Sequence, residues 1–123
     1  MIRIIENSFL KISASDHGAE LTSIYDKVNG REVLWQADPA YWKRHAPVLF
    51  PNVGRNYNDT WRLNGKEYVS KQHGFARDME FSLVMQDDSA VAMKLVSDEN
   101  TKAVYPFDFE LKITHRLADN NVI

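Results

Sequence analysis

Residues 107–117 read FDFELKITHRL, in which apolar and polar side chains alternate. Successive side chains of a β-strand point to opposite faces, so this alternation predicts a long strand with one buried face. The same period of two recurs near the start of the chain, in residues 10–14 and 21–25. We therefore expect an all-β protein built from antiparallel strands.

Tight turns separate the other expected strands. Asn64-Gly65 lies between two β-compatible arms, and this pair suits a two-residue hairpin because both turn positions need a positive φ angle. Asp87-Asp88-Ser89 separates a second pair of arms. Near the N-terminus, three or four strands within 35 residues predict an antiparallel meander, formed by residues 2–5, 10–14, 21–25 and 32–35.

Three segments depart from the strand pattern. Asp38 and Pro39 suit the N-cap and first position of a single helical turn. Pro47 and Pro51 bracket an apolar run, which favours an edge strand or irregular structure because proline cannot donate to a sheet ladder. Residues 98–103 predict one short helix.

Composition excludes several classes of protein. The 123 residues carry 15 Lys and Arg against 17 Asp and Glu, and this charge of −2 argues against a nucleic-acid partner. No apolar run approaches the roughly 18 residues of a membrane helix, so we expect no membrane partner. The absence of cysteine excludes disulfides and thiol catalysis, and agrees with the cytoplasmic location that we expect. We interpret residues 1–123 as part of a single domain, because no linker or repeat is visible.

One loop carries the densest chemistry. His73 lies in QHGFARD, residues 72–78, between the Asn64-Gly65 hairpin and the next strand. Binding groups commonly lie on loops held by a rigid sheet, and imidazole is well suited to proton transfer near neutral pH. Arg77 and Asp78 follow, either as site residues or as a structural ion pair.

A second candidate lies upstream. Arg55 follows Val53-Gly54, where an arginine either caps a strand end or points into a cleft to bind hydroxyl or carboxylate groups. His17 and His45 are expected on the surface, and His115 as a packed, hydrogen-bonded side chain. No metal-ligand spacing or phosphate-binding glycine motif is present, so we expect no metal and no cofactor.

Three motifs resemble the aldose 1-epimerase (galactose mutarotase) family, and in particular its LacX-like branch. They are YWKR with APVLFPNVGR (residues 41–44 and 46–55), QHGFARDMEF (72–81) and YPFDFEL (105–111). Their order and spacing agree over essentially the whole chain. The resemblance implies an antiparallel β-sandwich, often called a supersandwich, in a protein more than twice this length.

The resemblance also implies a reaction and a site. Family members interconvert the α and β anomers of aldoses by general acid/base ring opening, without a cofactor or metal. His73 matches the family histidine near the sugar ring oxygen, and Arg55 matches a sugar-binding arginine. Arg77 and Asp78 belong to the same motif, as substrate-binding or site-shaping residues. The ligand would be a hexose or hexose derivative.

The second family histidine, an aspartate and the glutamate base lie further along the family sequence. Residues 119–121 predict a turn and Val122-Ile123 begin a return strand. We therefore expect an N-terminal portion of the domain that is inactive as a mutarotase by itself. Two alternatives remain: a non-catalytic carbohydrate-binding β-sandwich, and a β-domain that self-associates through exposed sheet edges.

Overall fold

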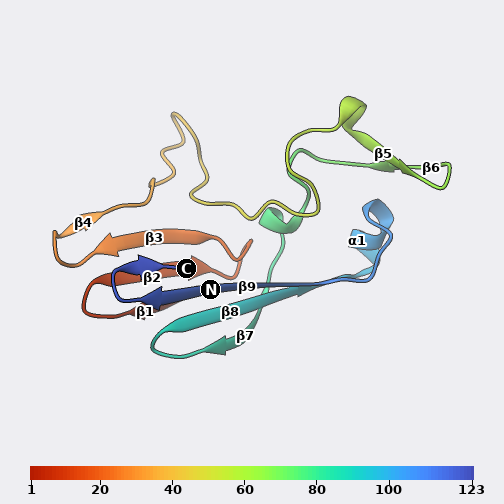
Figure 1. The fold of residues 1–123 in the computed structure, drawn as a ribbon. Coiled ribbons are helices and arrows are strands. Elements are labelled where there is room, and N and C mark those ends of the chain that lie inside the picture. Colours follow the sequence, from red (N-terminus) through yellow and green to blue (C-terminus); the bar gives the residue numbers. More distant parts are fainter.

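The computed structural model describes residues 1–123 and shows an all-β protein with one short α-helix (Figure 1). None of its helices has the length and hydrophobicity needed to cross a lipid bilayer. The strands are β1 (Ile2–Glu6), β2 (Leu10–Ser15), β3 (Leu21–Asp26), β4 (Arg31–Glu32), β5 (Thr60–Leu63), β6 (Lys66–Val69), β7 (Ser82–Gln86), β8 (Ala90–Val96), β9 (Glu110–Ala118) and β10 (Asn121–Val122). The helical segments are η1 (Tyr57–Asp59), η2 (Ala76–Asp78) and α1 (Glu99–Val104).

The strands form two four-stranded antiparallel sheets and a separate hairpin. One sheet has the order β1-β2-β3-β4, which is the expected meander, and the other has the order β10-β9-β8-β7. The β5–β6 hairpin projects away from both sheets, with α1 beside it (Figure 1). The long connections on either side of this hairpin carry the candidate site residues.

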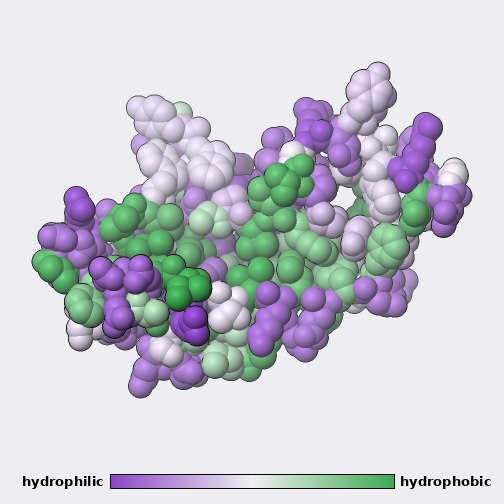
Figure 2. Space-filling view, in the orientation of Figure 1, coloured by the Kyte–Doolittle hydropathy of each residue, from purple (hydrophilic) through white to green (hydrophobic).

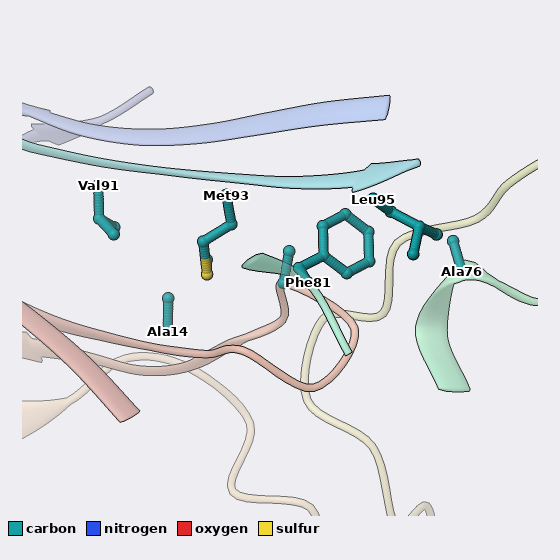
Figure 3. Close-up of a cluster of buried hydrophobic side chains, with 7 residues drawn as sticks. Ala14, Ala76, Phe81, Val91, Met93 and Leu95 are labelled. Atoms are coloured by element: carbon teal, nitrogen blue, oxygen red, sulfur yellow. The ribbon is translucent and has the colours of Figure 1, made fainter. Parts of the chain in front are cut away.

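A small core joins the two sheets. Ala14 of β2 faces Val91 and Met93 of β8, and Phe81 and Ala76 extend this cluster towards the loops (Figure 3). These side chains are almost fully buried, which confirms the expected one-sided burial of β2. The fold is therefore a sandwich in which apolar faces of both sheets meet.

Local sequence patterns correctly predicted several elements. Asn64 and Gly65 have φ angles of 50° and 78°, as the two-residue hairpin between β5 and β6 requires. In α1, the Asp98 carboxylate accepts a hydrogen bond from the Thr101 backbone N–H, and the Thr101 hydroxyl accepts one from the Asp98 N–H. This reciprocal capping box satisfies two backbone donors at the helix start.

The long strand predicted for residues 107–117 begins later than its alternation suggests. Pairing of β9 with β8 starts at Glu110, opposite Val96, because α1 occupies the connection up to Val104. Just before this pairing, the Phe109 carbonyl still accepts the Ser97 N–H at 3.0 Å, and the Phe109 ring packs on Phe50, with ring centroids 5.0 Å apart. The apolar face of this segment was thus predicted correctly, and its first pairing residue was not.

The fourth strand of the meander is shorter than predicted, whereas the turn after Asp38 agrees with the prediction. β4 covers only Arg31–Glu32, although the Val33 N–H still donates to the Ile24 carbonyl at 2.8 Å. The Glu32 carboxylate accepts the N–H groups of Ile24 and Leu34, so these two donors are not available to extend the ladder. The segment after Asp38 forms the single turn that the sequence predicted. The Trp42 N–H donates to the Asp38 carbonyl at 2.9 Å, and the Asp38 carboxylate accepts the Ala40 N–H as an N-cap does.

The molecule leaves much apolar surface in contact with solvent. Its accessible surface is 7751 Å², compared with about 6,800 Å² for a typical folded monomer of 14.2 kDa. Only 19 of 123 residues are buried. Hydrophobic side chains reach the surface on the face shown in Figure 2, and all five residues of edge strand β7 are exposed.

Candidate functional site

The candidate site is built on two loops that hydrogen-bond to each other. The His73 backbone N–H donates to the Gly54 carbonyl at 2.9 Å, and the Gly54 N–H donates to Nδ1 of the His73 ring at 2.8 Å. Nearby, the Phe50 carbonyl accepts the N–H groups of Phe75 and Ala76. These bonds bring the loop that carries Arg55 alongside the loop that carries His73.

Gly74 permits the close approach of these loops. Its φ angle is +73°, and a Cβ atom at this position would overlap the Phe50 carbonyl and lie 2.6 Å from Cδ of Pro51. Only glycine tolerates both this left-handed backbone and the lack of room for a side chain. The glycine after His73 in the motif is therefore explained by the close packing of the two loops.

The contact with Gly54 defines the chemical state of the His73 ring. Because Nδ1 accepts a hydrogen bond, the hydrogen of the neutral ring resides on Nε2. His73 thus presents Nε2–H as a donor. The exposed Gln72 amide is the other hydrogen-bonding neighbour of the ring, with its nitrogen 3.4 Å from Nε2. Exchanging the amide nitrogen and oxygen of Gln72 places an acceptor beside this donor.

Arg55 is exposed and paired within its own loop. Its guanidinium makes a bidentate pair with the Asp59 carboxylate, at 2.7 and 2.8 Å. This hydrogen bond, together with the charge of each partner, raises the pKa of Arg55 and lowers the pKa of Asp59, with burial opposing both shifts. Arg55 thus remains charged near the His73 loop and is oriented by Asp59.

Arg77 and Asp78 do not pair with each other by a salt bridge, so the ion pair considered from the sequence is wrong. Arg77 donates from a terminal guanidinium nitrogen to the Gln72 carbonyl at 2.9 Å, and its buried Nε has no partner within the chain. Asp78 pairs with Arg44 at 2.8 Å. Burial raises the pKa of Asp78, but the Arg44 hydrogen bond and the charges of Arg44 and Arg77 outweigh it and lower that pKa.

A cavity of about 520 Å³ is lined by other residues of the same two loops. Asp78 lines it, whereas Arg55 and His73 do not. Its walls include Trp61 of β5 and Tyr105 after α1, whose rings lie 6.2 Å apart. Asp78 was the one polar lining residue singled out from the sequence. Three others went unrecognised although Asn52 lies within the first motif, Asn56 directly follows it, and Ser70 lies two residues before the second.

The remaining histidines make local contacts. His17 pairs with Glu80 at 2.7 Å on the surface, and the His115 ring nitrogen Nε2 lies 2.8 Å from the Ala19 carbonyl, as expected for a packed side chain. His45 is half-buried beside Glu20, which corrects its expected surface position. No group of three or more His, Asp or Glu side chains is arranged to hold a metal ion.

Comparison with protein families identifies the chain. The family model described as aldose 1-epimerase matches residues 1–123. The chain belongs to the aldose 1-epimerase family. This aldose 1-epimerase family chain is 33% identical to the chromosomal LacX protein of Lactococcus lactis, over 96% of its own length and 41% of that protein. The match confirms the resemblance that the three motifs indicated.

Solved structures share the fold. The chain superimposes with a TM-score of 0.96 on a galactose mutarotase related enzyme from Lactobacillus acidophilus, at 43% identity, covering 98% of this chain and 40% of that one. A galactose mutarotase-like protein from Lactobacillus casei gives the same TM-score at 38% identity, covering 99% and 42%. This aldose 1-epimerase family chain therefore has the mutarotase-like β-sandwich fold, and it spans about two fifths of the length of these relatives.

Proposed function

We propose that residues 1–123 form the N-terminal portion of one aldose 1-epimerase-like domain that acts on a hexose or hexose derivative. Two observations support this proposal. The family model matches the whole chain, while the chain spans 41% of the LacX protein. The large exposed apolar surface is also what a partial sandwich presents before its remaining strands cover it.

The proposed reaction opens and recloses the sugar ring. A base removes the proton of the C1 hydroxyl while an acid donates to the ring oxygen, C1 rotates in the open form, and closure gives the other anomer. In this scheme His73 donates a hydrogen bond from Nε2–H to the ring oxygen and polarises it, and does not give up this proton. The observation that carries the proposal is the Gly54 hydrogen bond to Nδ1, which leaves Nε2–H available as the donor that this step needs.

In this proposal the charged neighbours of His73 either bind the sugar or shape the site. Arg55 donates to sugar hydroxyl groups, because its guanidinium is exposed and held by Asp59 close to the Gly54–His73 contact. Arg77 and Asp78 shape the loop around His73. The base and a second histidine come from the part of the family sequence that this chain does not contain.

The first prediction concerns activity. The 123-residue chain should not accelerate the interconversion of α-galactose or α-glucose, because it supplies the donor at the ring oxygen without the base at C1. The product of the intact reading frame should accelerate it. Anomer exchange followed by NMR or polarimetry compares the two proteins directly. Mutarotation by the 123-residue chain at the rate of the longer protein would contradict the proposal that the base lies outside these residues.

A pair of His73 variants in the longer protein tests the catalytic role. His73→Ala removes the ring, whereas His73→Asn retains an acceptor for the Gly54 N–H, tolerates the φ angle of +63° and lacks a donor at the Nε2 position. Both should reduce kcat by about 10²- to 10⁴-fold. Full activity in His73→Asn would exclude His73 as the hydrogen-bond donor to the ring oxygen.

A non-catalytic sugar-binding protein is the alternative outcome of the same experiment. In that case the intact protein would bind hexose without changing the rate of anomer exchange, and His73→Asn would weaken binding only.

We also propose that the 123-residue chain self-associates through edge strand β7, because the five exposed residues of this strand leave an unpaired sheet edge.

A further inference from the structure

We propose that Arg77 is the positioning residue of His73 and acts through the main chain of Gln72. This inference rests on the proposed function of His73, and it adds a role that is distinct from substrate contact. The Arg77 guanidinium donates to the Gln72 carbonyl at 2.9 Å, and the next residue in the chain is His73. Arg77 therefore restrains the peptide group that sets the direction of the histidine.

His73 requires such a restraint because of its backbone conformation. Its φ angle is +63°, in the left-handed region that side-chain-bearing residues seldom adopt. An unrestrained chain would relax to a negative φ angle, and the ring would then move away from the Gly54 N–H. The conformation persists only where surrounding contacts fix the peptide groups on both sides of the residue.

Three contacts fix those peptide groups. The His73 N–H is held by the Gly54 carbonyl, and the Gly74 N–H is held by the Lys71 carbonyl at 3.0 Å. The Gln72 carbonyl, which belongs to the same peptide group as the His73 N–H, is held by Arg77. Arg77 is thus the one side chain among three restraints, and its removal can be tested without altering the backbone.

The main chain of Arg77 is itself fixed by packing, so the side chain starts from a defined backbone position. The Arg77 carbonyl lies against Gly18, where a Cβ atom would approach it to 2.8 Å. Arg77 also belongs to the short helical segment η2, which follows directly from the Phe50 contacts of Phe75 and Ala76. The side chain therefore spans from a fixed segment back to the peptide group before His73.

The test uses the product of the intact reading frame labelled with ¹⁵N-histidine. Long-range ¹H–¹⁵N spectra distinguish a ring nitrogen that carries a hydrogen from one that accepts a hydrogen bond, and His73→Gln assigns the signal. Arg77→Met keeps the side-chain length and removes the donors. Arg77→Lys retains one donor for the Gln72 carbonyl. Arg62→Met is the matched control, because Arg62 pairs with Glu67 on the exposed β5–β6 hairpin.

The expected result is a loss of the single Nε2–H form of His73 in Arg77→Met, with kcat reduced by about 10- to 100-fold and KM changed little. Arg77→Lys should restore much of both, and Arg62→Met should match the parent. Unchanged His73 ring signals in Arg77→Met would overturn the proposal, whatever the activity.

The spectra also separate this proposal from the proposed function. If the intact protein proves inactive as a mutarotase while Arg77→Met still alters the His73 ring, the positioning role stands and the catalytic assignment fails. If the parent is active and Arg77→Met loses activity through KM alone, with the ring unchanged, Arg77 contacts the substrate and does not position His73.

Discussion

At the scale of single residues, Gly74 and Gly54 have different reasons for being glycine. Gly54 has a positive φ angle of 85° but nothing lies within 4 Å of the position of a Cβ atom. Gly74 combines a positive φ angle with direct overlap onto the Phe50 carbonyl. The contact between the two loops therefore depends most on the absence of a side chain at Gly74.

Gly74→Ala should lower the free energy of unfolding by about 3 kcal/mol, because steric overlap adds to the strain of a left-handed backbone. Gly65→Ala is the matched control, since its φ angle of 78° is similar and its surroundings are empty. It should cost only about 1 kcal/mol. Urea denaturation of both variants measures the difference. Equal losses would show that the approach of Gly74 to Phe50 contributes nothing to stability.

At the scale of elements, an ion pair connects β1 to the turn that follows β2. Arg3 donates two hydrogen bonds to the Asp16 carboxylate, at 2.9 and 2.8 Å, and the Asp16 side chain is only 12% exposed. The Asp16 main chain also bonds to Met1 and Phe81. Asp16 thus links the first strand to the segment that precedes β7.

This pair predicts a pH-dependent stability. The hydrogen bond from Arg3 chiefly lowers the pKa of Asp16, against the opposing effect of burial. A lowered pKa in the folded state stabilises the protein above the unfolded-state pKa of about 3.9, and this contribution is lost as the pH falls through the folded value. The parent should therefore lose stability below about pH 4 more steeply than Asp16→Asn does.

Urea midpoints at several values between neutral and acidic pH test this expectation. Asp16→Asn should be less stable than the parent at neutral pH, and the difference should shrink in acid. The exposed turn variant Asp88→Asn is the control, and should follow the parent throughout. A difference that stays constant with pH would mean that the charge of Asp16 is not what stabilises the fold.

At the scale of the whole molecule, exposed apolar surface dominates the expected behaviour. Strand β7 ends its sheet, and Val84 is left unpaired at a register shift between Leu83 and Met85. Val84 is 44% exposed. An open edge with apolar side chains can add a strand from a second copy, whereas a lysine on such an edge opposes pairing.

Val84→Lys should therefore reduce the concentration-dependent rise in mass expected of the 123-residue chain. The control is Val28→Lys, which adds the same charge at an exposed turn between β3 and β4. Sedimentation equilibrium over a wide range of concentration compares the parent and both variants. A monomeric parent, or equal effects of the two lysines, would rule out association through β7.

The sequence alone determined the elements whose causes are local. Alternation placed β2, β3 and β9, Asn64-Gly65 fixed a hairpin, and Asp98 began α1, because each signal depends on residues a few positions apart. The motif around His73 likewise indicated the family, because its residues are contiguous in the chain. The predicted ends of β4 and β9 were wrong where a contact outside the local pattern intervenes. Glu32 accepts the Ile24 N–H with its side chain, and Phe109 packs on Phe50.

Only the tertiary structure decided how the candidate residues meet. Gly54 and His73 lie 19 positions apart, and Arg44 and Asp78 lie 34 apart, so no local pattern specifies either contact. The packing of Phe50 against Gly74 and Phe75 brings the two loops together, and the Gly54 N–H then selects Nε2 as the donor nitrogen of His73. Sequence thus supplied the chemical groups, and non-local packing gave them their partners and directions.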